Sequence, residues 1–228
     1  MCGIIAAASN RHVGKLLVQG LHKMEYRGYD SAGIALHQGD KIAHLRALGK
    51  VQLLEEKMVA EKPKSKLGIA HTRWATHGEP SEANAHPHKS KDSVYIVHNG
   101  IIENYIELRE SLIKEGYSFT SQTDSELIAH LLDKYMGEGA SMTGAMYQAK
   151  EKLEGAYAIA AIDINDDQKL VVARNKSPLL LGLGTDEFFA ASDPLAIAQH
   201  TNDFVFLEDG DVAELTANTY KVFDANQN

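Results

Sequence analysis

Residues 155–163 read Gly-Ala-Tyr-Ala-Ile-Ala-Ala-Ile-Asp, a nearly continuous apolar run with no alternation of polar and apolar positions. A strand with one face in water alternates with period two, so this run predicts a strand that is covered on both faces. Two sheets packed together and flanked by helices supply such cover. Hairpin patterns outnumber helices placed between strands, which argues against a doubly wound parallel sheet. We therefore expect an α+β fold built from two antiparallel sheets with helices on the outside.

Hydrophobic periodicity along the rest of the chain predicts the other elements. A capping box is expected at residues 123–126, where Thr-Asp-Ser-Glu precedes a helical pattern. The polar stretch 79–92 lies between two strand patterns and is expected to be a functional loop. Helices are expected at 13–24, 51–60, 106–114, 125–135, 142–153 and 194–200, and strands at 2–8, 32–37, 41–45, 67–73, 94–98, 157–163, 169–174, 179–182, 187–191, 204–207, 212–215 and 220–223.

Composition excludes several classes of protein. The 228 residues carry 23 basic and 31 acidic side chains, which gives a net charge of −8. A general nucleic-acid binder needs a cationic face, and a peripheral membrane protein uses a basic cluster. The longest apolar runs fall far short of the ~18 residues of a membrane span. With one cysteine no internal disulfide can form. We expect one cytoplasmic domain over residues 1–228, with neither nucleic acid nor membrane as a partner.

The position of the single cysteine, Cys2, is the unusual feature. An internal lone cysteine is more often a small buried apolar residue. Aminopeptidases remove Met1 when the next residue is small, so Cys2 is expected to become the mature N-terminus. An α-amine has a pKa of about 7.7–8.0 and a thiol about 8.5, so the amine can act as base for the thiol nucleophile. This predicts an N-terminal-nucleophile enzyme that cleaves an amide, and a chain that keeps Met1 is expected to be close to inactive.

Acyl transfer needs hydrogen-bond donors that stabilise the oxyanion, and Asn99 and Gly100 are the best candidates. The alternative is an Asn-Gly hairpin turn, which the dipeptide alone favours. Residues 101–105 do not alternate as a return strand should, and they lead into a helical pattern. The chemistry leaves these two interpretations equally supported.

Arg73 and Asp124 are candidates for binding the two charged ends of an amino acid. Arg73 ends a predicted strand and opens a loop rich in Thr, His and Gly; a guanidinium binds a carboxylate bidentately. A strand-end arginine is more often solvated. Asp124 can pair with an α-ammonium group, or it can simply favour the start of the following helix.

Five of the eleven histidines lie between residues 71 and 98. This clustering raises the hypothesis of a metal site, but the lone cysteine restricts ligands to histidine and carboxylate side chains. A His-Glu-x-x-His helix pair is also missing from the sequence. Hydrogen bonds that order the loop are the preferred interpretation, and we expect neither a metal ion nor another cofactor.

Six blocks of sequence together resemble a known family. In chain order and with similar spacing, they resemble the glutaminase domains of glucosamine-6-phosphate synthases, the isomerising glutamine–fructose-6-phosphate aminotransferases of hexosamine biosynthesis. These domains are class II, N-terminal-nucleophile amidotransferases. A start at Cys2 alone also fits the amidotransferases of purine, asparagine and glutamate synthesis. The blocks are residues 1–5, 25–33, 71–78, 84–88, 98–104 and 123–126.

This resemblance implies a four-layer αββα sandwich and hydrolysis of L-glutamine to glutamate and ammonia through a thioester. It implies that Cys2 is the nucleophile and that Asn99 and Gly100 form the oxyanion hole. It assigns the α-carboxylate of glutamine to Arg73 and the α-amino group to Asp124.

The same resemblance implies further contacts from two loops. Trp74, Thr76 and His77 are expected to contact and close over glutamine, with Arg27 and Gly28 nearby.

The chain departs from the family in two conservative ways and in length. Ala6 stands where the family usually has Gly, and Ser125 stands where it has Thr, and neither change affects the proposed chemistry. The sugar-isomerase domains of the full enzyme, which bind fructose 6-phosphate, are expected to be absent, and synthase activity with them. The full enzyme can also form a homo-oligomer.

Two other functions compete with this interpretation. The first is an N-terminal-cysteine acylase for bile-salt conjugates or penicillins, which needs an apolar acyl pocket instead of an Arg–Asp pair. The second is a non-catalytic binding module whose histidine-rich loop binds a metal or a partner.

Overall fold

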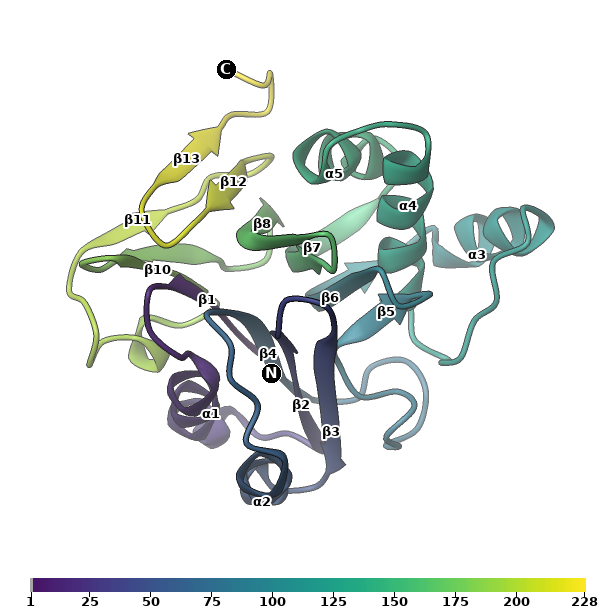
Figure 1. Cartoon of the computed structure of the whole chain (residues 1–228). Helices are drawn as coiled ribbons and strands as arrows, with labels where there is room; N and C mark the ends of the chain where they lie inside the picture. The colour runs from purple at the N-terminus through teal and green to yellow at the C-terminus, as the bar shows by residue number, and fades with distance from the viewer. Residues whose placement is uncertain (1) are drawn as a thin grey trace.

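The computed structural model describes residues 2–228, and within them the strands form two antiparallel sheets (Figure 1). The seven-stranded sheet has the order β11 (Phe204–Phe206), β9 (Leu180–Leu183), β10 (Glu187–Ala191), β1 (Gly3–Ser9), β4 (Leu67–Arg73), β2 (Ser31–His37) and β3 (Ile42–Leu48). The six-stranded sheet has the order β13 (Tyr220–Phe223), β12 (Val212–Leu215), β8 (Asp166–Asn175), β7 (Gly155–Asp163), β6 (Val94–Ile102) and β5 (His88–Ser90).

Helices cover the outer face of each sheet. The helices are α1 (Gly14–Lys23), α2 (Val51–Glu61), α3 (Tyr105–Lys114), α4 (Glu126–Gly137) and α5 (Met142–Lys150), with 3₁₀ turns η1 (Glu25–Arg27) and η2 (Pro194–Ala196). Buried side chains of α1 and α2 share one apolar cluster with the first sheet, and those of α4 and α5 share another with the second. A third cluster lies between the sheets. The order of layers is therefore αββα, as expected.

Strand β7 shows why this sandwich forms. Its side chains alternate between two apolar environments: Ile159 and Ala161 face the helices of the second sheet, and Ala158 and Ala160 face the first sheet. Both faces of the strand are therefore buried, which confirms the prediction from its sequence.

Two local predictions were wrong. The helix expected at 194–200 is only the three-residue turn η2, in which Asp193 caps Leu195. The capping box at 123–126 does not form, because α4 begins at Glu126 and its N-cap residue Ser125 makes no side-chain cap. The Glu126 carboxylate instead binds the preceding loop, because the chain folds back over the start of α4.

Glu126 fixes that loop through four hydrogen bonds. Its carboxylate is buried and accepts from the backbone N–H and the hydroxyl of Thr120, at 2.8 and 2.9 Å, and from the same groups of Ser121, at 2.7 and 2.6 Å. The loop that carries Asp124 is thereby held between α4 and the second sheet.

Among the helices of residues 2–228, none has both the length and the apolar character of a membrane-spanning segment.

We predict that Glu126→Gln lowers the free energy of unfolding by about 3 kcal/mol, because an amide N–H₂ then faces two donors in a buried site. Urea denaturation measures the change. Glu107→Gln, an exposed substitution on α3, is the matched control and should change stability by less than about 0.5 kcal/mol. Equal stability of the two variants would contradict the role of Glu126.

Candidate active site

Nine of the ten predicted site residues line one pocket of about 260 Å³. It opens at the N-terminal end of β1, where loops from both sheets meet. The predicted residues that line it are Cys2, Arg27, Arg73, Trp74, Thr76, His77, Asn99, Gly100 and Asp124. Gly28 is the predicted residue that does not line it.

Cys2 lies directly before β1, the central strand that pairs with β4 on one side and β10 on the other. Its Sγ accepts a hydrogen bond from the backbone N–H of Trp74 at 3.2 Å and lies 3.5 Å from the carbonyl oxygen of the same residue. Burial raises the pKa of the Cys2 thiol, although the Trp74 N–H acts in the opposite direction. The thiol therefore needs a base to become a nucleophile at neutral pH.

Asn99 and Gly100 lie inside strand β6. They pair with Ala158 and Tyr157 of β7, so the alternative interpretation as a hairpin turn is wrong. Gly100 has a φ of +134°, and a Cβ there would overlap with the carbonyl oxygen of Ala156, so only glycine fits. The Asn99 Nδ2 donates to the carbonyl oxygen of Cys2 at 3.2 Å, which places this amide beside Cys2.

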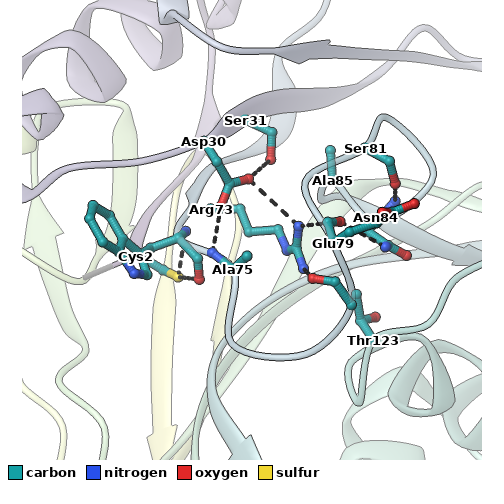
Figure 2. A network of polar contacts seen from close by, with 12 residues as sticks. Cys2, Asp30, Ser31, Arg73, Ala75, Glu79, Ser81, Asn84, Ala85 and Thr123 are labelled. Carbon is teal, nitrogen blue, oxygen red and sulfur yellow. Dashed lines mark hydrogen bonds and ion pairs between the residues drawn. The ribbon is translucent and has the colours of Figure 1, made fainter.

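Arg73 is buried, not solvated, and it organises the loop that follows β4 (Figure 2). Its guanidinium donates to the carbonyl oxygens of His77 at 2.6 Å, Gly78 at 3.0 Å and Glu79 at 3.4 Å. It also forms an ion pair with Asp30 at 3.6 Å. The loop therefore wraps around a fixed positive charge that faces the pocket.

Asp30 joins Arg73 to the backbone of the loop that contacts Cys2. Its carboxylate accepts from the N–H of Ala75 at 2.5 Å and from the hydroxyl of Ser31 at 2.9 Å, as Figure 2 shows. Sequence reasoning quoted Asp30 only as part of the block 25–33 and gave it no role. The signal that could have found it is its place in that block, directly before strand β2.

Asp124 is buried and binds the second sheet, not its own helix. Its Oδ2 accepts from the N–H of Ile102 at 2.8 Å, at the end of β6. Its Oδ1 lies 3.4 Å from the Ser125 hydroxyl and 3.9 Å from His77 Nδ1. A carboxylate oxygen thus lines the pocket with weak protein contacts, which leaves it able to accept from a ligand.

Gly28 contributes through Trp74. It has a φ of +76°, and a Cβ there would come within 2.5 Å of the indole ring. Trp74 is 53% exposed and lines the pocket. Arg27, the residue before, lines the pocket and forms an ion pair with Asp193 at 3.5 Å.

The buried histidines serve as neutral hydrogen-bonding groups. Burial lowers the pKa of His71 to about 3 and that of His88 well below its usual value. His88 Nε2 bonds to the hydroxyl of Thr123 at 3.0 Å, and Nε2 of the half-buried His44 bonds to the carbonyl oxygen of Pro87 at 2.9 Å. These bonds order the loop as expected. Residues 2–228 contain no group of three or more His, Cys, Asp or Glu side chains arranged to hold a metal ion.

A family model described as a glutamine amidotransferase domain matches residues 71–199, more than half of the chain. The chain belongs to the glutamine amidotransferase family. This amidotransferase chain is 49% identical over 228 residues to a glutamine–fructose-6-phosphate aminotransferase (isomerising) of Shewanella oneidensis and 52% identical over 226 residues to that of Vibrio cholerae. The matches cover 100% and 99% of the chain, which spans about 37% of the length of each relative.

Solved structures show the same fold at lower sequence identity. A glutamine phosphoribosylpyrophosphate amidotransferase from B. subtilis superposes with a TM-score of 0.85 at 23% identity, over all of this chain and 50% of that one. A glutamine aminotransferase class-II domain protein from Silicibacter pomeroyi gives 0.64 at 16% identity, covering 98% of this chain and 99% of that one. The fold is that of the N-terminal-nucleophile amidotransferases.

Several pocket residues of the amidotransferase were missed from sequence. Ser192 is the clearest: its hydroxyl accepts from the N–H of Ile4 at 2.9 Å, and its own N–H donates to the Ile4 carbonyl at 3.1 Å. These two bonds therefore hold β1 in place at Ile4, two residues after Cys2. No local pattern marks it, because the contact joins residues far apart in the chain. The other missed lining residues are His86, His98, Ile101, Thr123, Ser125, Ser177 and Pro178.

We predict that Gly100→Ala lowers stability by about 2 kcal/mol or more, because the new methyl group overlaps with the β7 backbone at a φ that alanine rarely adopts. Chemical denaturation measures the loss. Gly116→Ala is the control: it also has a positive φ, of +93°, but nothing lies within 4 Å of the added Cβ. If both substitutions cost the same, the close approach to Ala156 does not constrain the strand.

Proposed function

We propose that this chain hydrolyses L-glutamine to L-glutamate and ammonia, with Cys2 as the nucleophile once Met1 has been removed. The observation that carries the proposal is that one pocket holds the Cys2 thiol, an amide donor beside it, and two buried groups of opposite charge, Arg73 and Asp124. Met1 lies outside the described residues, so its removal is part of the proposal.

The chemistry follows from the groups around Cys2. In the processed chain its α-amine takes the thiol proton, and the thiolate attacks the side-chain amide carbon of glutamine. The oxyanion accepts hydrogen bonds from Asn99 Nδ2 and the Gly100 N–H. The amine returns the proton to the leaving nitrogen, the C–N bond breaks and ammonia departs. Water then attacks the γ-glutamyl thioester, which gives glutamate and restores the thiol.

The pocket charges select the substrate in this proposal. Arg73 binds the α-carboxylate and Asp124 the α-ammonium group, so a free amino acid is recognised at both ends. Trp74, Thr76 and His77, on the loop that Arg73 organises, contact the bound glutamine and cover it. An acylase for hydrophobic amides would instead need an apolar wall where these two charges lie.

In the whole protein, the ammonia would be used in a second reaction that lies outside this chain. The relatives are named glutamine–fructose-6-phosphate aminotransferases, so we propose that ammonia passes to fructose 6-phosphate in sugar-isomerase domains. Residues 1–228 then form one glutaminase domain. The whole enzyme would be cytoplasmic, would need no cofactor and could assemble as a homo-oligomer.

We predict that protein lacking Met1, confirmed by intact mass, releases glutamate from L-glutamine and not from D-glutamine. Cys2→Ala should abolish the release, because the nucleophile is lost. Protein that retains Met1 should be close to inactive, because Cys2 then carries an amide nitrogen instead of a basic amine. Rapid turnover by Met1-containing protein, or by Cys2→Ala, would overturn the proposal, as would hydrolysis of penicillins or bile-salt conjugates in place of glutamine.

We predict that Asp124→Asn raises KM for L-glutamine by about 10- to 100-fold, because a charge-assisted bond to the α-ammonium group is lost while the acceptor for Ile102 remains. Asp40→Asn, on the exposed turn before β3, is the matched control. Glutaramate, which is glutamine without its α-amino group, separates the roles. Asp124→Asn should hydrolyse it as well as the wild type does, whereas an equal loss on both substrates would contradict the assignment.

A further inference from the structure

The orientation of the Asn99 amide decides whether it can act in the oxyanion hole. Its Nδ2 can donate to an oxyanion, whereas its Oδ1 would repel one. A strand residue beside Cys2 can present either end, since the two differ by a half-turn of the amide. Something in the structure must therefore hold the Nδ2 toward the nucleophile.

His71 of β4 contacts the other end of that amide. Its Nε2 lies 2.9 Å from Asn99 Oδ1 and 3.0 Å from the carbonyl oxygen of His98. A backbone carbonyl only accepts hydrogen bonds, so the close contact with His98 requires the proton to be on Nε2. The backbone of His98 is also fixed on its other side, because its N–H donates to His86 Nδ1 at 3.3 Å.

The ring of His71 carries one proton, not two. His71 is fully buried, and its ring stacks on that of His86 with centroids 4.0 Å apart. Its Nδ1 is buried and has no hydrogen-bond partner among residues 2–228. An unprotonated nitrogen is better tolerated there than an N–H, because a buried N–H without an acceptor is costly. Burial lowers the pKa of His71 to about 3, in agreement with a neutral ring.

These bonds leave one favourable orientation for Asn99. With the proton on His71 Nε2, the Oδ1 of Asn99 must accept, and its Nδ2 faces the Cys2 carbonyl oxygen at 3.2 Å. The flipped amide would set donor against donor at His71 and acceptor against acceptor at Cys2. Of the two N–H groups on Nδ2, one binds Cys2 and the second is available to an oxyanion.

We propose that His71 is a positioning residue for the oxyanion hole, where it holds the Asn99 amide with its N–H₂ toward the nucleophile. This proposal deepens the glutaminase function and rests on it. His71 does not line the pocket, so it acts on the reaction only through Asn99.

The kinetic test compares His71→Leu and His71→Gln in Met1-free protein. Loss of one oxyanion donor lowers kcat by about 10²- to 10³-fold, so His71→Leu should lower kcat by at least about 10-fold with KM changed less than about twofold. His71→Gln restores a donor near the Nε2 position and should recover most of the loss. Unchanged kcat in a folded His71→Leu protein, or a loss confined to KM, would overturn the proposal.

A double-mutant cycle with Asn99→Ala tests whether His71 acts through Asn99. In that background His71→Leu should cause little further loss of kcat, whereas multiplicative losses would show an independent role and contradict the proposal. His130→Leu is the matched control, because His130 is a buried histidine on α4 that bonds to Ser90 at 2.8 Å, away from the pocket. It should lower stability without lowering kcat of the folded enzyme.

A second readout does not depend on activity. Nitrogen NMR of histidine-labelled protein at about pH 7 should show His71 as a neutral ring protonated at Nε2. A ring protonated at Nδ1, or on both nitrogens, would overturn the proposal even in an active enzyme. If the wild type proves inactive on glutamine, the proposed function fails, while this spectrum still decides the His71–Asn99 arrangement.

Discussion

The pairing of β1 between β4 and β10 is the constraint on which the site depends. Gly3 pairs with Thr72 and Ile5 with Ala191, so Cys2 lies next to the point where β4 ends and its loop begins. A shift of one residue in this register would exchange the two faces of the strand. The thiol would then leave the Trp74 backbone. The buried apolar side chains of β1, packed on both faces, oppose such a shift.

The second sheet completes the site from the opposite side. Strand β6 runs through Asn99 and Gly100 without turning, because its partner β7 pairs with it along its whole length. The same strand receives Asp124 at its end, through the N–H of Ile102. His71 crosses from the first sheet to hold Asn99. Cys2, Asn99 and the two charged side chains, Arg73 and Asp124, are thus brought to one pocket by strands of both sheets and the loops that join them.

Much of this arrangement could be predicted from sequence, where the signal is local. The apolar run of β7 predicted the sandwich, and nine of the ten residues predicted for the site, Cys2 among them, line one pocket. The choice between a turn and a strand at Asn99-Gly100 stayed open, because Asn-Gly favours a turn locally and only the distant partner β7 makes it a strand. Glu126 binds a loop instead of capping α4 for the same reason. The roles of Ser192 and His71 arise from contacts between strands, which no short pattern records.

The most direct measurement of the central claim is a crystal structure of Met1-free Cys2→Ala protein with L-glutamine. We predict that the α-carboxylate binds Arg73 and the α-ammonium group binds Asp124. The side-chain amide oxygen should lie within hydrogen-bond distance of Asn99 Nδ2 and the Gly100 N–H, with its carbon facing residue 2. Glutamine bound in the reverse direction, or outside this pocket, would contradict the account.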